Sequence, residues 1–94
     1  KYKEKGRRNH LKKNYGMTVA DFEALLAKQN GRCAICGTDD PPRYKSNRGG
    51  WHVDHDHSTG RVRGILCPLC NVALGHFKED VNRMSNAIKY ILTA

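Results

Sequence analysis

The chain has 94 residues, a formal net charge of +8, 38% hydrophobic residues and 7% aromatic residues. This length allows one small domain, and so polar a chain buries too little apolar surface to be stable without a brace, for which its four cysteines are the candidates. The sequence holds no run of 18 apolar residues, which excludes a membrane span, and we expect no secretory signal in the chain as given, because no basic segment leads into an apolar one.

Positive charge is concentrated near the N-terminus. Residues 1–13 hold seven lysines and arginines against one glutamate, so they carry six of the eight net positive charges. A basic block beside a nearly neutral domain predicts a polyanionic partner, most simply nucleic acid. The alternative is a disordered tail that only improves solubility. The predicted DNA-binding residues of this block are Lys3, Lys5, Arg7, Arg8, Lys12 and Lys13.

The first predicted elements are two helices. Residues 1–15 could form a basic helix. Thr18 is a candidate N-cap with Asp21 at the third helical position, close to a capping box, and the pattern then predicts a helix over 19–29. Gly31 is expected at the C′ position that ends this helix. The apolar residues on one face of the second helix are Phe22, Leu25 and Leu26.

A loop and a hairpin follow. Residues 37–50 carry two prolines and three glycines, which predicts a loop. Residues 51–55 and 61–66 have the composition of two short strands, and the small residues at 58–60 supply the turn between them. The middle of the chain is therefore expected to form an antiparallel hairpin.

Two more helices are predicted after the hairpin, over 71–77 and 80–92. The second has apolar residues at helical spacing, and such a stripe usually faces a protein core. We therefore expect the following side chains to face the core: Val81, Met84, Ile88 and Ile91.

The cysteines form two CxxC units, Cys33–Cys36 and Cys67–Cys70. A CxxC turn can place two thiolates about 3.5–4 Å apart, which is the edge of a tetrahedral zinc site with Zn–S distances of about 2.3 Å. Two disulfides would need an oxidising compartment, and a redox CxxC would need a βαβ context that is missing. We therefore expect a structural Zn²⁺ with four protein thiolates, which leaves no open position for catalysis.

Residues 51–57, between the two CxxC units, hold three of the five histidines and two carboxylates, and Asn71 directly follows the last cysteine. Phosphodiester hydrolysis needs a base that titrates near neutral pH, which histidine provides, and a hard cation to stabilise charge on the phosphate. Mg²⁺ prefers oxygen ligands, so one carboxylate and one amide oxygen can suffice. The alternatives are ordinary hairpin polar residues, a structural metal site, or a helix cap at Asn71.

The sequence DHDHSTGRVRGILCPLCN over 54–71, together with NGRCAICG over 30–37, resembles the recombination endonuclease VII family, phage-type members of the HNH or His-Me finger nucleases. The resemblance covers about residues 17–77 at motif level. It implies an α+β fold, a small zinc-stapled ββα-metal domain with flanking helices. We expect residues 1–16 to be a basic DNA-binding helix or arm and residues 17–94 to be the nuclease domain.

The resemblance also implies residue roles. Asp54 and Asn71 would bind the catalytic Mg²⁺ or Mn²⁺, and His55 would activate the attacking water. His57 matches a further active-site histidine that either contacts the scissile phosphate or assists proton transfer. The structural zinc ligands would be Cys33, Cys36, Cys67 and Cys70, and further DNA contacts would come from Arg61 and Arg63.

Strict alternation along a strand conflicts with this assignment, because it puts Asp54 and His55 on opposite faces. Both can serve one site only if the backbone twists, bulges or ends the strand there. Asp56 is expected instead to have a structural role, orienting a histidine or an arginine.

The resulting prediction is a metal-dependent DNA endonuclease that leaves 5′-phosphate and 3′-hydroxyl ends, acting in the cytoplasm of a bacterial or phage-infected cell. Junction-resolving relatives carry a long C-terminal extension for dimerisation. A nicking or double-strand-cutting enzyme therefore fits this length better than a junction resolvase, and monomer and homodimer both stay open. The alternatives are a non-catalytic zinc-stapled DNA-binding module and, less well supported, an RNA-cleaving enzyme.

Overall fold

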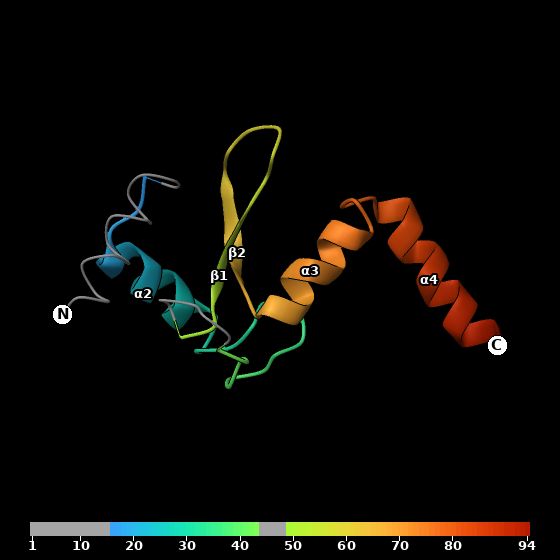
Figure 1. Cartoon of the computed structure of the whole chain (residues 1–94), viewed down its shortest axis with the longest axis horizontal. Coiled ribbons are helices and arrows are strands. Elements are labelled where there is room, and N and C mark those ends of the chain that lie inside the picture. The colour runs from blue at the N-terminus through green and yellow to red at the C-terminus, as the bar shows by residue number, and fades with distance from the viewer. Residues whose placement is uncertain (1–15, 44–48) are drawn as a thin grey trace.

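The computed structural model describes residues 16–43 and 49–94. A two-stranded hairpin stands between two helices, and a third helix continues to the C-terminus (Figure 1). This arrangement confirms the predicted small α+β class. The predicted helix over 1–15 lies outside the described residues. The elements in chain order are α2 (Val19–Lys28), β1 (His52–His55), β2 (Val62–Leu66), α3 (Pro68–His76) and α4 (Val81–Thr93).

Helix α2 begins at the predicted capping box. The Thr18 hydroxyl accepts from the Asp21 amide at 3.0 Å, and the Asp21 carboxylate accepts from the Thr18 amide at 3.1 Å. The helix ends one residue earlier than predicted, and Asn30, not Gly31, occupies the C′ position with φ of 59°. The Asn30 amide donates to Ala27 and the Gly31 amide to Leu26, which is the Schellman pattern.

The long segment after α2 has no helix or strand in its described parts, as predicted. Gly50 ends it with φ of +97°, and a Cβ at this position would lie 2.6 Å from the Pro42 carbonyl oxygen. Only glycine fits this left-handed, crowded position. Gly50 therefore lets the chain fold back against Pro41–Pro42 before it enters the hairpin.

The hairpin forms with one irregularity in its pairing. Strands β1 and β2 are antiparallel, with Val53 opposite Ile65 and Asp54 opposite Gly64. The next residue, His55, pairs with Val62, so the register shifts between Asp54 and His55. The extra residue is Arg63, so the bulge lies on β2. Strand β1 ends at His55, which is one of the ways in which Asp54 and His55 can serve one site.

The turn of the hairpin is stabilised by Asp56, which has the expected structural role but a different partner. Its carboxylate accepts from the Ser58 backbone amide at 2.8 Å. This hydrogen bond is the first cause of a lowered pKa at Asp56. The carboxylate therefore holds the turn, where we had expected it to orient a histidine or an arginine.

Helix α3 begins three residues before the predicted start at residue 71. Its N-cap is Cys67, whose sulfur accepts from the Cys70 amide at 3.5 Å, and Pro68 occupies the first helical position. Proline suits this position because its missing N–H would have no helical partner. Asn71 therefore lies inside the first turn, which removes the interpretation of Asn71 as a helix cap.

The core lies where α2 and α3 meet the hairpin. Helix α2 packs against β2, and α3 packs against both strands. Phe22, Leu25 and Leu26 of α2 all belong to this cluster, as predicted. The buried hydrophobic residues of the core are Met17, Phe22, Cys33, Trp51, Val53, Ile65, Leu66 and Cys67.

The prediction that α4 faces the core is wrong. Helix α4 begins at Asp80 as its N-cap and covers nearly the predicted range, but it extends away from the hairpin (Figure 1). The exposed fractions are 72% for Val81, 59% for Ile88 and 71% for Ile91. Helical spacing defines an apolar face but does not say what covers it. Nothing in the described residues covers this one.

Among the described residues, no helix is both long enough and apolar enough to cross a membrane.

Candidate functional site

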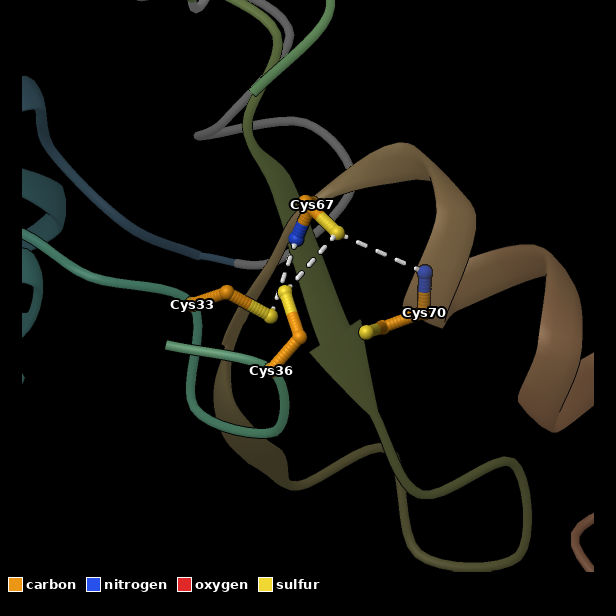
Figure 2. A group of neighbouring side chains, drawn as sticks. All are labelled: Cys33, Cys36, Cys67 and Cys70. Atoms are coloured by element: carbon orange, nitrogen blue, oxygen red, sulfur yellow. Dashed lines mark hydrogen bonds between the residues drawn. The ribbon is translucent and has the colours of Figure 1, made fainter. Parts of the chain in front are cut away.

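The four cysteines converge on one point. Cys33 and Cys36 come from the loop after α2, Cys67 from the end of β2 and Cys70 from α3, and their sulfurs point toward one another (Figure 2). All four sulfurs lie within 4.8 Å of one another, and the Cys36 and Cys67 sulfurs are 3.7 Å apart. A tetrahedral zinc site has a sulfur–sulfur edge of about 3.8 Å. The cysteines are free thiols and could bind zinc.

Backbone amides donate hydrogen bonds that stabilise a thiolate in this cluster. The Cys33 sulfur accepts from the amides of Ile35 and Cys67, each at 3.4 Å. Burial acts to raise the pKa of Cys33, but the amides of Cys67, Cys36 and Ile35 outweigh it and lower the pKa to about 6. At Cys70, burial and the neighbouring thiols raise the pKa. A bound cation would offset the repulsion between neighbouring thiolates, because it binds all four sulfurs in their deprotonated form.

A second cluster lies between β1 and α3. It surrounds a pocket of about 270 Å³. Four of the lining residues are predicted active-site residues, and the pocket brings them together: Asp54, His55, His57 and Asn71. The other lining residues are His52, Val53, Leu74, Gly75 and Glu79.

Each part of the fold contributes to this convergence. Strand β1 ends at His55, and the neighbours Asp54 and His55 both line the pocket there. The turn then returns His57 toward His55, so that their ring centroids are 4.7 Å apart. The early start of α3 at the cysteine cluster fixes where Asn71 lies, one residue after Cys70.

An ion-pair network runs along one rim of the pocket. The Arg63 guanidinium donates to both oxygens of Asp54, at 2.8 and 3.0 Å, and to Glu79 at 2.7 Å. The other Glu79 oxygen lies 3.2 Å from Nε2 of His57. Hydrogen bonds to Asp54 and then to Glu79 raise the pKa of Arg63 further above its already high usual value.

Two polar residues of this site are not among the predicted site residues. One is His52, although its place two positions before Asp54 is a signal that could have found it. Glu79 lies in the turn between α3 and α4, 16 residues from Arg63, and belongs to no motif. Of the predicted DNA contacts, Arg63 is held by carboxylates, Arg61 is exposed, and the six in the basic block lie outside the described residues.

The pocket has a donor set that fits a hard divalent cation. Asp54 offers carboxylate oxygens and Asn71 an amide oxygen, which are the ligand types that Mg²⁺ and Mn²⁺ prefer. The Asp54 side chain is only 14% exposed, and Arg63 is its charge partner in this structure.

A hairpin and helix braced by a four-cysteine cluster, with histidines, a carboxylate and an amide around one pocket, define a small metal-binding α+β domain. The chain belongs to the recombination endonuclease VII family, whose family model matches residues 8–93.

Two curated phage proteins are similar to the chain. It is 40% identical over 78 residues to the Gene 59 protein of Mycobacterium phage D29 and 38% identical over 79 residues to the Gene 59 protein of Mycobacterium phage L5. These matches cover 82% and 83% of the chain, but only 44% and 45% of the relatives. The chain thus spans less than half the length of the curated relatives it matches.

Proposed function

We propose that the chain is a metal-dependent DNA endonuclease of the HNH type, which hydrolyses phosphodiester bonds in the pocket between β1 and α3. The observation that carries the proposal is that one pocket is lined by Asp54, His55 and Asn71. These residues supply two oxygen ligands and one base. The chemistry of phosphodiester hydrolysis needs this combination.

In the proposed reaction, His55 accepts a proton from the water that attacks the phosphorus. Asp54 and Asn71 would hold Mg²⁺ or Mn²⁺, which supplies charge stabilisation at the phosphate and at the departing 3′ oxygen. His57 lies beside His55 and is held by Glu79, so it is positioned to contact the scissile phosphate or to assist proton transfer. The products would carry 5′-phosphate and 3′-hydroxyl ends.

We further propose that the four cysteines hold a structural Zn²⁺. Its ligands would all be protein thiolates, so it would contribute to folding and not to chemistry. Because the cluster includes the N-cap of α3, it would fix Asn71 relative to the hairpin.

The proposed contacts with DNA are positional. Residues 1–16 would form a basic arm beside the nuclease domain at 17–94, and Arg61 would contact the DNA backbone near the pocket. Such contacts bind phosphates without reading sequence and weaken as salt rises. Since DNA is the proposed substrate and the curated relatives are phage proteins, we propose that the chain acts in the cytoplasm of a bacterial cell.

The test is a cleavage assay on supercoiled plasmid with zinc-loaded protein, with and without Mg²⁺ or Mn²⁺. We expect cation-dependent nicking or linearisation by the wild type and a loss of at least about 100-fold in His55→Ala, because the general base is removed. His76→Ala is the matched control. His76 ends α3 outside the pocket, so this variant should cleave normally.

Plasmid binding, measured in parallel, separates the two candidate functions. Both variants should bind DNA as the wild type does. Tight binding by the wild type with no cleavage under any divalent cation would leave a non-catalytic zinc-stapled DNA-binding module and reject the nuclease. Cleavage of RNA in preference to DNA would correct the substrate.

A further inference from the structure

Arg63 lies between two carboxylates of the pocket and satisfies both. Its guanidinium donates to both oxygens of Asp54 and, through Nη2, to Glu79 at 2.7 Å. The Arg63 side chain is 37% exposed, whereas Asp54 is 14% exposed and Glu79 28%. Arg63 is therefore an internal counter-ion of the pocket, which makes it a poor candidate for the DNA-backbone contact that the sequence suggested.

A bulge in the hairpin lies at Arg63, the residue whose side chain contacts Asp54. Asp54 pairs with Gly64 and His55 pairs with Val62, so Arg63 has no Cα partner on β1. An extra residue of this kind bends its strand and redirects its side chain, and such bulges are frequent beside functional sites. The guanidinium of this bulged residue contacts both oxygens of Asp54.

The turn between α3 and α4 places Glu79 within hydrogen-bond distance of Arg63. Lys78 and Glu79 both have φ of +55°, a left-handed conformation that strains non-glycine residues. The Glu79 amide donates to the Leu74 carbonyl at 2.9 Å and holds this conformation in place. Strain of this kind persists where the surrounding structure over-determines it, commonly at ligand clamps and switches.

A divalent cation on Asp54 would compete with Arg63 for the same two oxygens, and two positive centres on one carboxylate repel each other. Glu79 gives the guanidinium a second partner that it already contacts. We propose that Arg63 is a positioning residue that sets the cation affinity of the pocket. It pairs with Asp54 and Glu79 in this structure and is retained by Glu79 alone when a divalent cation binds Asp54. This inference rests on the proposed function, since it takes Asp54 as a cation ligand.

The test measures binding of Mn²⁺ alone to the zinc-loaded chain by titration calorimetry at about 0.15 M salt, without DNA. Arg63→Gln should bind Mn²⁺ about 3- to 10-fold more tightly, because a partly exposed bidentate ion pair no longer competes. Arg61→Gln is the matched control. It removes the same charge two residues away, where no contact with Asp54 exists, and should change affinity by less than about twofold. Unchanged or weaker binding in Arg63→Gln would overturn the proposal.

Arg63→Lys is a second variant in case Arg63→Gln folds poorly. It keeps the charge but loses the planar fork that grips both oxygens, so its Mn²⁺ affinity should lie between those of the wild type and Arg63→Gln. Affinity equal to or below that of the wild type would contradict the competition. Circular dichroism and the unfolding temperature report the fold of each variant.

Glu79→Gln tests the second half of the proposal. It should weaken Mn²⁺ binding, because Arg63 is left with Asp54 as its carboxylate partner in the network. In the Arg63→Gln background the same change should have little effect, because Glu79 acts through Arg63. If Glu79→Gln weakens Mn²⁺ binding equally in both backgrounds, Glu79 acts on the cation directly. The proposal that Glu79 retains Arg63 when a cation binds Asp54 would then be rejected.

A last variant separates failure of this inference from failure of the proposed function. Asp54→Asn should abolish the Mn²⁺ site. If the wild type itself binds no Mn²⁺ that depends on Asp54, the proposed cation site is wrong. If it binds Mn²⁺ through Asp54 but Arg63→Gln binds no more tightly, only the role of Arg63 is wrong.

Discussion

Gln29 joins the helical and β parts of the molecule through a single side chain. Its Oε1 accepts from the Ile65 amide at 2.9 Å, and its Nε2 donates to the carbonyls of Ile65 at 2.9 Å and Arg32 at 2.8 Å. Ile65 is fully buried, so its amide needs a partner within the protein. The side-chain amide pairs with the outer edge of β2 as a neighbouring strand would. A Cβ on Gly64 would lie 3.0 Å from the same Oε1.

We predict that Gln29→Ala lowers the free energy of unfolding by about 1–3 kcal/mol, because it leaves the buried Ile65 amide without its acceptor. Urea denaturation of the zinc-loaded protein measures the change. Lys28→Ala, one residue earlier and exposed, is the control and should cost less than about 0.5 kcal/mol. Equal stability of Gln29→Ala and the wild type would show that water replaces the Gln29 side chain as the acceptor for the Ile65 backbone amide.

At the residue scale, the sequence predicts what is local and misses what is distant. The capping box of Thr18 and Asp21 is readable because both partners lie within one turn. The hydrogen bonds from the Gln29 side chain to the Ile65 backbone join residues 36 positions apart, and no sequence pattern in either segment predicts them. The pairing of Arg63 with Glu79 is of the same kind, which is why Arg63 was interpreted as a DNA contact.

At the scale of elements, the four-cysteine cluster ties the loop after α2 to the end of β2 and the first turn of α3 (Figure 2). The core beneath it is small, with eight buried hydrophobic residues among those described. A domain of this size gains little net stability from its core alone. The proposed Zn²⁺ would therefore supply a large part of the folding free energy.

We predict that a strong chelator under reducing conditions unfolds the hairpin and α3. The expected signal is loss of ellipticity and of the cooperative thermal transition, with recovery on adding one equivalent of Zn²⁺ per chain. Mg²⁺ is the control and should restore nothing, because thiolates select softer cations. A chelated protein with an unchanged thermal transition would contradict a zinc-dependent fold.

Element positions were predicted better than element environments. The predicted helices over 19–29 and 80–92 and both strands are present within one or two residues, since caps, periodicity and turn residues mark them. Helix α3 starts earlier than predicted because Cys67 serves both as ligand candidate and as N-cap. The exposure of α4 could not be predicted, because its apolar spacing is the same whether or not another surface covers it.

At the scale of the whole molecule, α4 leads away from the hairpin and α3 (Figure 1). Two separate clusters divide the chemistry: sulfurs between the two CxxC units, and oxygens and imidazoles around the neighbouring pocket. Helix α3 joins them directly, because Cys70 and Asn71 are consecutive residues of its first turn. The proposed Zn²⁺ would therefore act in folding, and the proposed Mg²⁺ or Mn²⁺ in cleavage.

The most direct test of this account is cleavage of supercoiled plasmid by Asp54→Asn across a titration of Mg²⁺, with plasmid binding measured on the same samples. Asparagine keeps the size of the side chain but removes the charge that the cation needs. We predict that cleavage falls by at least about 100-fold while binding of DNA is kept. The matched control, Asp39→Asn in an exposed loop position, should cleave as the wild type does. Wild-type cleavage by Asp54→Asn would contradict a cation-dependent nuclease site in this pocket.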